Sequence, residues 1–492
     1  MAQLNSSLEN FQRRFKQDIF PPNWVNPRPT EIYDLLVLGG GPGGMTAATI
    51  AKSLGATHVA LIEKEHLGGE CLSYGCIPSK ALLRSSRLAQ EIRQAADYGL
   101  EISNGWRVNF QAVMQRVLGM QTVISPHDSA DHFKHLGIDV FLGTGHFIGP
   151  NQLTVGNQTI HFKKAIIATG TQPIPLNIPG LEYSDYLTNQ NIFNLSKLPP
   201  RLAVIGAGPI SCELSQAFLR FGSQVILVTH GSNLLTKDDP IAAERLKNIF
   251  EKEGMRIFTH SNLIQVKKKG NEKILYLDSH PEPIIVDEIL VGIGRMPVVE
   301  GLGLDNAGVA YDRKMGISTN AYLQTSNPNI YAAGDATSPY KFTHIAKELS
   351  TLAVANALNG NQEKSSSLII PWCTYTDPEI AHIGLNEETA KKLGIPVETI
   401  VIEMADVDRA ILDGQTTGFV KLIVKENHDQ IIGATVMAAH AGDMLSEVCV
   451  AMNSENGLSA LLKSIHPFPT QAQILRTAAQ TLLNKRHSYA SR

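Results

Sequence analysis

The stretch from residue 33 to residue 63 constrains the fold more than any other part of the chain. An apolar run at 33–38 leads into a glycine-rich turn at 39–44, an alanine-rich stretch at 45–54 and a second apolar run at 59–62, which ends in Glu63. A strand, a GxGxxG turn, a helix and a strand with an acid about 20 residues beyond the turn form the pattern of a dinucleotide-binding βαβ unit. The glycines allow a close approach to pyrophosphate, and the acid can bind ribose hydroxyls. The glycines that we expect at this site are Gly39, Gly41, Gly43 and Gly44.

A second pattern of the same kind lies at 201–228. An apolar run leads into the turn at 206–211, in which Ser211 replaces the third glycine, and the pattern ends in Thr229 and His230 rather than in an acid. A carboxylate at that point would bind the ribose of NAD and repel a 2′-phosphate. Its absence favours NADPH over NADH, although no arginine fork for the phosphate is present either. We expect Gly206, Gly208 and His230 to contact this second dinucleotide.

Two cysteines, Cys71 and Cys76, lie five positions apart and just before Pro78. Proline is favoured in the first turn of a helix, so the pair is predicted at a helix N-terminus, where the macrodipole lowers the pKa of a thiol. Four intervening residues allow a dithiol and a disulfide to interconvert. Two buried structural cysteines, or half of a zinc site, are the alternatives. No second Cys/His pair with metal spacing follows, and we therefore predict no resident metal.

Two nucleotide folds and a dithiol in one chain suggest an electron path. One dinucleotide would be a tightly held flavin and the other an exchangeable nicotinamide, with electrons passing from NAD(P)H through the flavin to the disulfide.

Composition excludes several other classes of protein. The chain has 492 residues, of which 43% are hydrophobic, and its net charge is −3, so nothing indicates binding to nucleic acid. No apolar run reaches the roughly 18 residues that span a bilayer, and we expect no membrane association. Five cysteines are too few for a secreted disulfide scaffold, which favours a cytoplasmic location.

The predicted fold class is α/β, with two doubly wound Rossmann-type nucleotide-binding domains and an α+β C-terminal dimerisation domain. We expect five parts: an N-terminal arm (1–30), the first part of an FAD-binding domain (31–172), an NAD(P)-binding domain (173–298), the second part of the FAD-binding or central domain (299–365) and an interface domain (366–492).

Six motifs resemble the class I pyridine nucleotide-disulfide oxidoreductases, in particular their branch of mercuric reductases and dihydrolipoamide dehydrogenases. They are GGGPGG at 39–44, GGECLSYGCIPSK at 68–80, ATG at 168–170, GAGPISCE at 206–213, GIGRMP at 292–297 and YAAGD at 331–335. The resemblance spans about residues 31 to 485.

This resemblance implies roles for individual residues. Cys71 would be the interchange thiol that faces the substrate, and Cys76 would face the flavin as a thiolate. Lys80, paired with Glu213, would lie near the flavin, and Asp335 would hold its ribityl chain. The resemblance further implies FAD, NADPH (or NADH) and a homodimer in which the partner's C-terminal domain completes the active site. The other residues expected at the cofactors are Gly69, Thr169, Gly170, Gly294 and Gly334.

The chain departs from the disulfide-reducing members near its C-terminus. Those members carry a His-Pro-x-x-x-Glu motif whose histidine is the general acid and base. Here Phe468 takes the place of the histidine in one alignment, with Gln473 in place of the glutamate. In the other alignment His466 returns, but Gln471 replaces the glutamate. His466 is a candidate catalytic base, and a histidine packed at the interface is the alternative.

We therefore expect an FAD-dependent NAD(P)H oxidoreductase that is mercuric-reductase-like and passes electrons to a small-molecule acceptor at the Cys71–Cys76 pair, either Hg(II) or a disulfide. The tail at 484–492 lacks the cysteine pair of mercuric reductases. A dihydrolipoamide dehydrogenase or another disulfide reductase is the second reading. A soluble transhydrogenase or a diaphorase/quinone reductase, in which the cysteines are secondary, is the third.

Overall fold

The computed structural model describes residues 8–102, 105–454 and 456–490. It divides into two compact units, which are described separately here. The first comprises Met1–Pro199 and Glu288–Leu368, and the second comprises Pro200–Asp287 and Ile369–Arg492. The five-part division expected from the sequence stays a prediction. In the described part of the chain, every helix is too short or too polar to cross a bilayer.

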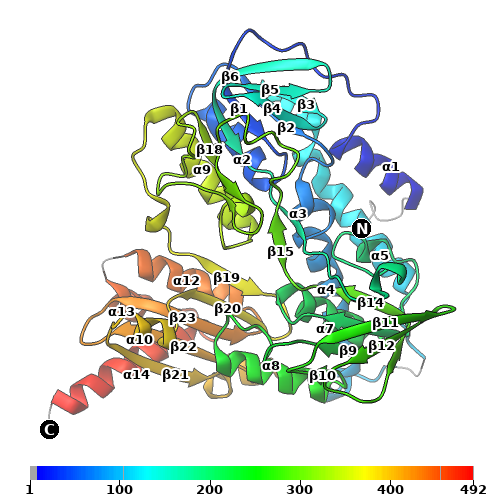
Figure 1. Ribbon diagram of the computed structural model, residues 1–492. Coiled ribbons are helices and arrows are strands. Elements are labelled where there is room, and N and C mark those ends of the chain that lie inside the picture. The colour runs from blue at the N-terminus through cyan, green and yellow to red at the C-terminus, as the bar shows by residue number, and fades with distance from the viewer. Residues whose placement is uncertain (1–7, 103–104, 455, 491–492) are drawn as a thin grey trace. The chain divides into compact units, whose positions relative to one another are not determined.

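The first unit is built around a sheet with the strand order β3-β2-β1-β6-β5-β4, in which β18 also pairs with β6 (Figure 1). β1, β2, β3, β6 and β18 run parallel, while β4 and β5 form an antiparallel extension of β6. The strands are β1 (Tyr33–Leu38), β2 (Val59–Glu63), β3 (Asp139–Leu142), β4 (Gly145–Gly149), β5 (Gln152–Val155), β6 (Gln158–Ile167) and β18 (Ile330–Ala332).

The central strands are apolar on both faces because helices or loops cover both sides of a parallel sheet. β1 and β2 pair in register, with Val37 opposite Leu61 and Leu38 opposite Ile62, and these side chains are almost completely buried. The nucleotide turn follows β1 at the carboxyl edge of this sheet, where α/β proteins bind their ligands.

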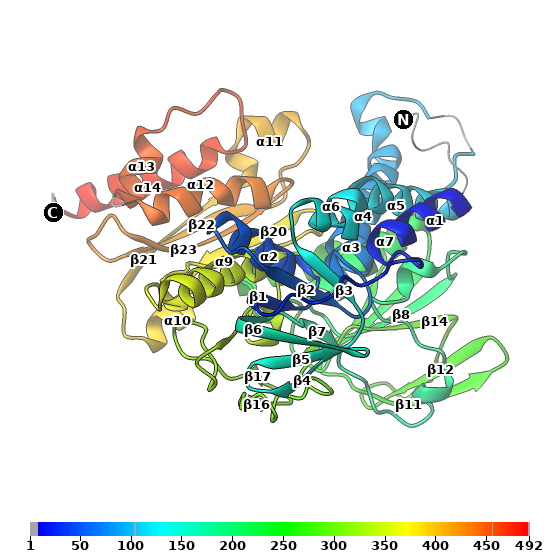
Figure 2. The ribbon, with the colours of Figure 1, turned by 90° about the horizontal axis from the view of Figure 1, so that it is seen from above.

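The helices of the first unit are α1 (Leu8–Ile19), α2 (Pro42–Ser53), α3 (Gly69–Ser73), α4 (Cys76–Arg93), α5 (Phe110–Ile124), α6 (Ala130–His135) and α9 (Thr343–Asn359). α2 and α9 pack side by side (Figure 2). Gly43 makes this packing possible, because a Cβ there would lie 2.9 Å from Ser350 Oγ on α9. α1 packs on α5 through the buried Phe11, and the Thr122 hydroxyl donates a hydrogen bond to the carbonyl of Phe11.

The second unit contains the other nucleotide fold. β8 (Arg201–Ile205), β9 (Gln224–Val228) and β10 (Arg256–Phe258) run parallel, and α7 (Pro209–Phe221) follows the turn after β8. α8 (Pro240–Lys252) precedes β10, and β11 (Leu263–Lys269), β12 (Glu272–Leu277) and β13 (Ile284–Val286) form an antiparallel sheet. Arg201 forms ion pairs with Asp287 and Glu272. These pairs link β8, the first strand of this fold, to β12 and to the residue that follows β13.

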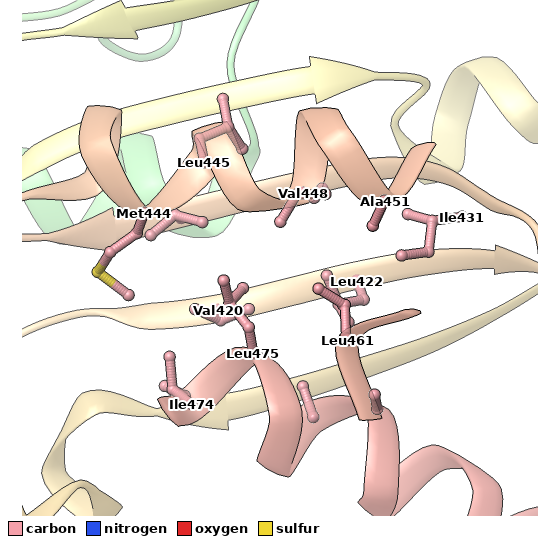
Figure 3. Close-up of a cluster of buried hydrophobic side chains, with 14 of the residues drawn as sticks. Val420, Leu422, Ile431, Met444, Leu445, Val448, Ala451, Leu461, Ile474 and Leu475 are labelled. Atoms are coloured by element: carbon pink, nitrogen blue, oxygen red, sulfur yellow. The ribbon is translucent and has the colours of Figure 1, made fainter. Parts of the chain in front are cut away.

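The C-terminal part of the second unit is an antiparallel sheet in the order β19-β20-β23-β22-β21 with helices packed on it. Side chains of α12, α13 and α14 meet Val420 and Leu422 of β22 in one buried cluster (Figure 3). On β22 Lys421 is buried as well, and its ammonium group lies 2.7 Å from the buried carboxylate of Asp239. The elements are β19 (Pro371–Thr374), β20 (Glu379–Gly384), α10 (Glu387–Lys392), β21 (Val397–Glu403), α11 (Asp408–Leu412), β22 (Phe419–Lys425), β23 (Ile431–Ala438), α12 (Ala441–Asn453), α13 (Gly457–Lys463) and α14 (Gln473–Ala490).

The structure differs from the sequence-based expectation in one place, and one expected residue cannot be compared because it lies outside the described residues. The segment 171–198 is rich in proline, asparagine and serine, which predicts a linker with surface loops. It nevertheless contains strand β7 (Thr171–Pro173), which pairs with β15 (Arg295–Pro297). Because this partner lies more than 120 residues away, local sequence does not reveal the strand. The apolar spacing expected for the N-terminal arm begins at Leu4, which lies outside the described residues, and the helix is described from Leu8.

Candidate functional site

The first glycine turn has the geometry of a pyrophosphate cradle. Gly39 adopts φ +113° and donates its N–H to the carbonyl of Ile62 at 2.8 Å. A Cβ on Gly44 would lie only 1.8 Å from Gly39 O, so α2 can approach the turn this closely only with glycine at that position. Gly41 is the N-cap of α2 and has no side-chain cap, and a Cβ there would have no neighbour nearer than 3.8 Å. Backbone N–H groups at the N-terminus of α2 therefore face open space, as binding of an anion requires.

Glu63, at the end of β2, fixes the loop beside this turn. Its Oε2 accepts the N–H of Gly40 at 2.6 Å, and its Oε1 accepts the N–H groups of Glu65 and His66 at 2.6 and 3.2 Å. Burial raises the pKa of the Glu63 carboxyl, against the effect of these three hydrogen bonds. A carboxylate offers about four acceptor sites, so one on Oε2 is left for a ribose hydroxyl.

The dithiol loop rests directly on the nucleotide turn. Gly68 donates its N–H to Gly40 O at 2.9 Å, and a Cβ on Gly69 would lie 2.7 Å from the Cα of Gly41. Gly68 and Gly69 have φ values of +84° and +56°, which glycine adopts without strain. The N–H of Leu67, the residue before them, is held by the carbonyl of Ile19 at 3.0 Å.

Cys71 lies within α3 and Cys76 is the first residue of α4. Both are thiols in this structure, and Cys76 Sγ lies 3.4 Å from Thr343 Oγ1 at the start of α9. The expectation that the helix N-terminus lowers the pKa of the thiol is wrong for Cys71. The hydrogen bond that Cys71 makes with Cys76, together with burial, raises the pKa of Cys71, and only Thr343 acts in the opposite direction.

A chain of polar contacts connects the dithiol helix to Asp335. The guanidinium of Arg295 pairs with the carboxylate of Glu70, the residue before Cys71. Arg295 also donates to Thr171 Oγ1 at 2.8 Å and to Thr171 O at 3.0 Å, and Thr171 Oγ1 donates to Asp335 Oδ2 at 3.1 Å. Burial raises the pKa of Asp335, while Arg295 and Lys341 oppose this effect. Nothing in the spacing of the GIGRMP motif indicates that its arginine reaches Glu70.

The remaining predicted residues of the first unit lie near the same edge of the sheet. Thr169 donates its hydroxyl to Val298 O at 2.8 Å. Gly170 has open space where a Cβ would be, and Gly294 accepts the N–H of Ile174. Gly334 has a φ of +71°, and a Cβ on it would lie 3.1 Å from Ala346 of α9.

The second unit holds the other predicted group. Gly206 adopts φ +108° and donates its N–H to Val228 O at 2.8 Å, and Gly208 is the N-cap of α7 with nothing within 4 Å of a Cβ. The residue that corresponds to Glu63 is Thr229, whose hydroxyl oxygen accepts the N–H of Gly231, while His230 is exposed. This turn therefore offers the same cradle without a carboxylate.

The structure places Lys80 on α4 of the first unit and Glu213 on α7 of the second, so their pairing stays a prediction. Glu213 is buried and accepts the backbone N–H of Tyr375 at 2.9 Å.

His466 has a carboxylate partner that the sequence motif does not reveal. Its Nε2 lies 2.8 Å from Glu447 Oε1 on α12, and its Nδ1 is buried without a hydrogen-bond partner among the described residues. The side chain of His466 is only 6% exposed, whereas that of Phe468, two residues later, is 72% exposed. No motif spacing could have indicated Glu447, because it precedes His466 by 19 residues and lies on α12, whereas His466 lies in the segment between α13 and α14. The catalytic role of His466 stays a prediction.

Together these observations fit two dinucleotides. The first turn, the carboxylate of Glu63 and the polar group around Asp335 suit FAD, and the dithiol loop lies against that turn. The second turn suits a nicotinamide coenzyme. When bound, FAD supplies a two-electron carrier between NAD(P)H and a disulfide.

Comparisons with known proteins agree with this reading. Residues 33–356 match the family model described as pyridine nucleotide-disulphide oxidoreductase, and residues 370–479 match the dimerisation domain of the same family. A mercuric reductase from Staphylococcus aureus is 34% identical over 98% of this chain and 88% of its own length. A dihydrolipoyl dehydrogenase from Chlamydia muridarum is 33% identical, over 91% of this chain and 96% of its own length.

A solved structure of the HOCl-induced flavoprotein disulfide reductase RclA from Escherichia coli, a Cu(II) complex, superposes with a TM-score of 0.81. It is 26% identical to this chain and covers 92% of it and 100% of RclA. By sequence, fold and site, the chain belongs to the FAD- and NAD(P)H-dependent pyridine nucleotide-disulphide oxidoreductase family.

Proposed function

We propose that this enzyme transfers electrons from NADPH, through FAD, to a thiophilic small-molecule acceptor at Cys71, and that Hg(II) is the representative acceptor. The observation that carries the proposal is the position of the dithiol: Gly69 packs on Gly41 of the nucleotide turn, and Cys71 and Cys76 share a hydrogen bond. A flavin bound at this turn would supply electrons to the dithiol, whose loop packs against the same turn.

The C-terminal motif supports a metal-ion acceptor over a disulfide. Reduction of a disulfide releases a thiolate that needs a proton, which relatives take from a histidine. Phe468 stands at that position in one alignment, and its exposed ring has no proton to give. Reduction of a soft metal ion needs no proton for a leaving group, and thiolates are the ligands that such ions prefer. The Staphylococcus relative is named a mercuric reductase, and the RclA structure is described as a Cu(II) complex.

Disulfide reduction is the second candidate, and the pair of His466 and Glu447 favours it. In the homodimer that we propose, the C-terminal domain of the partner would bring this pair to the dithiol of the first subunit. Replacing His466 with Ala and Glu447 with Gln would each lower the turnover of a disulfide substrate at least about tenfold if the pair acts as an acid and base. The same variants would leave metal-ion reduction unchanged. We further propose that the enzyme works in the cytoplasm, where NADPH is available and free thiols stay reduced.

Anaerobic titration of the purified enzyme with NADPH and with NADH tests the electron path. We expect NADPH to reduce the flavin at lower concentration and a long-wavelength absorbance band to appear as Cys76 becomes a thiolate. Turnover is then measured with Hg(II) in excess thiol, Cu(II), oxidised glutathione, lipoamide and a quinone.

Cys71→Ser separates the chemical classes, with Cys449→Ser on α12 as the matched control. We expect the Cys71 variant to lose turnover with thiophilic acceptors and the Cys449 variant to retain it. If Cys71→Ser keeps full turnover with the best acceptor, the enzyme is instead a diaphorase or transhydrogenase.

A further inference from the structure

The loop 229–239, which joins β9 to α8, lies directly beside the second nucleotide turn. Leu235 of this loop donates its N–H to the carbonyl of Ala207, inside the turn, at 3.0 Å. In a fold of this kind the turn holds pyrophosphate, and the end of the second strand holds the adenosine ribose. The loop therefore flanks the adenosine half of a coenzyme that binds at this turn.

Leu235 has a backbone conformation that needs support from its surroundings. Its φ is +45°, in the left-handed region that leucine rarely adopts, and its side chain is buried. Asp238 donates its N–H to Leu235 O at 2.8 Å and so closes the loop on the side toward α8. Because a sparsely populated conformation persists only where neighbouring contacts fix it, the position of Asp238 matters for Leu235.

Trp372 on β19 anchors Asp238. Its indole Nε1 donates a hydrogen bond to Asp238 Oδ1 at 2.8 Å, and Asp238 is buried. The indole ring packs on the ring of His382 on β20, with the two centroids 4.5 Å apart. His382 is itself buried, and its two ring nitrogens lie 2.9 Å from Thr435 Oγ1 and 3.1 Å from Gly384 O. The antiparallel sheet thus holds a hydrogen-bond donor that reaches the loop of the nucleotide fold.

Lys421, on β22 of the same sheet, anchors the next residue of the loop. Its ammonium group lies 2.7 Å from Asp239 Oδ2 and 3.0 Å from Glu387 Oε2. Asp239 is also the N-cap of α8, and its side chain accepts the N–H of Ile241 at 2.9 Å. The end of the loop therefore rests on the C-terminal sheet at two adjacent carboxylates, of which Asp238 is the one bonded to Leu235.

We propose that Trp372 is a positioning residue for the nicotinamide coenzyme. Through the carboxylate of Asp238 it holds the loop 229–239 in the conformation that receives the adenosine half. A loop that is fixed before binding loses less entropy when the coenzyme enters, and a loop that is fixed for only part of the time raises the apparent Kd in inverse proportion to that fraction. The inference rests on the proposed function in one respect, since it takes the second turn as the coenzyme site.

The test measures coenzyme binding separately from the later steps. Each flavin-loaded enzyme is mixed anaerobically with a series of NADPH concentrations, and the rate at which the flavin absorbance falls gives an apparent Kd and a limiting rate. Trp372→Phe keeps an aromatic ring and removes the N–H. We expect it to raise the Kd at least about fivefold, as the loss of a hydrogen bond to a charged group allows. The limiting rate should stay, because the adenosine half takes no part in hydride transfer.

Trp24→Phe is the matched control. It also removes an indole N–H, which donates to Val140 O at 3.1 Å in the first unit, away from the loop 229–239 in sequence and fold. We expect this variant to keep the Kd of the wild type. An equal rise in both variants contradicts the proposal, because the effect would then follow from the loss of any indole hydrogen bond.

A double-mutant cycle shows whether Trp372 acts through Asp238. Asp238→Leu removes the acceptor, whereas Asp238→Asn keeps an oxygen for the indole N–H. We expect Asp238→Leu to raise the Kd about as much as Trp372→Phe does, and Asp238→Asn to stay close to the wild type. The variant that carries both Trp372→Phe and Asp238→Leu should bind NADPH no more weakly than the weaker single variant. Asp238→Leu and Asp238→Asn also carry the test if Trp372→Phe does not fold.

An unchanged Kd in Trp372→Phe overturns the inference, and so do effects that add in the double variant. Gly208→Leu tests the proposed function separately. Gly208 has a φ of −76° and nothing within 4 Å of a Cβ, so leucine fits the backbone and its side chain would fill the cradle. If NADPH reduces the flavin of Gly208→Leu as it does in the wild type, the second turn is not the coenzyme site and the proposed function fails. If Gly208→Leu loses reduction while Trp372→Phe and Asp238→Leu keep the Kd of the wild type, only the inference fails.

Discussion

The two nucleotide turns have nearly the same backbone and different chemical surroundings. Gly39 and Gly206 have φ values of +113° and +108°, and each donates its N–H to the neighbouring strand at 2.8 Å. Gly41 and Gly208 are N-caps with the same φ of −76°. One residue beyond the strand acceptor, however, the first fold has Glu63 and the second has Thr229. Glycine spacing sets the cradle, and we propose that the residue at this one position distinguishes the two ligands.

The two folds also differ at the third glycine position of the turn, where the following helix packs against it. In the first fold, glycine at position 44 lets α2 touch Gly39, whereas in the second fold the corresponding residue is the buried Ser211. A real Cβ at position 211 requires more separation between α7 and its turn. We therefore expect the first site to be the tighter one, as suits a cofactor that stays bound.

The largest effect should come from Gly44→Ala. The added Cβ would lie 1.8 Å from Gly39 O, which forces the backbone to move and costs about 1–3 kcal/mol or more. We expect the purified variant to lose most of its flavin, measured as the ratio of absorbance at 450 and 280 nm. The matched change Ser211→Ala, where a Cβ already exists, should retain full flavin content. Equal losses in both variants would mean that the two turns do not differ in tightness.

Glu63→Gln should have a smaller effect on the same measurement. The amide has only one oxygen for the three N–H groups that the carboxylate accepts, so at least one of them loses its partner, at a cost of about 1–3 kcal/mol. We expect a lower melting temperature and weaker flavin retention. Thr229→Ala, the matched change in the second fold, removes a single acceptor and should leave the flavin content as it is.

Thr229→Glu should make the second site resemble the first. A carboxylate there repels a 2′-phosphate and accepts ribose hydroxyls. We expect the ratio of kcat/KM for NADPH to that for NADH to fall about tenfold, which corresponds to about 1.4 kcal/mol. Thr229→Ser is the control, and an unchanged ratio would show that coenzyme choice is made elsewhere.

The smallest effect should come from His230→Ala. An exposed side chain that meets a phosphate in water contributes about 0.2–1 kcal/mol, so KM for NADPH should rise about 1.4- to fivefold. KM for NADH should stay constant. A parallel rise in both constants would indicate a change in the fold of the loop rather than lost contact with the phosphate.

Elements that depend on residues close together in the chain could be predicted from the sequence. The glycine turn, the apolar strands beside it and the helix that starts near Cys76 were all predicted, because each depends on residues close together in the chain. The Rossmann-type fold class and the C-terminal dimerisation domain were confirmed.

What the sequence could not indicate depends on residues that only the fold brings together. The carboxylate of Glu447 on α12 reaches His466 in the segment between α13 and α14, and Arg295 reaches Glu70 across 225 positions. The pKa of Cys71 was expected to fall because a helix N-terminus was considered without the second sulfur. The neighbouring thiol and burial raise that pKa instead.

The hydrogen bond from Leu67 to Ile19 has a practical consequence. The match to the family begins at Tyr33. The hydrogen bond, however, comes from Ile19 at the end of α1, and it holds the backbone at Leu67, two residues before Gly69. We expect a chain that begins at Tyr33 to form the sheet of the first unit. It would lack the hydrogen bond that holds the loop before Cys71 and Cys76. Such a trimmed protein should therefore show faster exchange of the amide hydrogen at Leu67 and a faster reaction with thiol reagents.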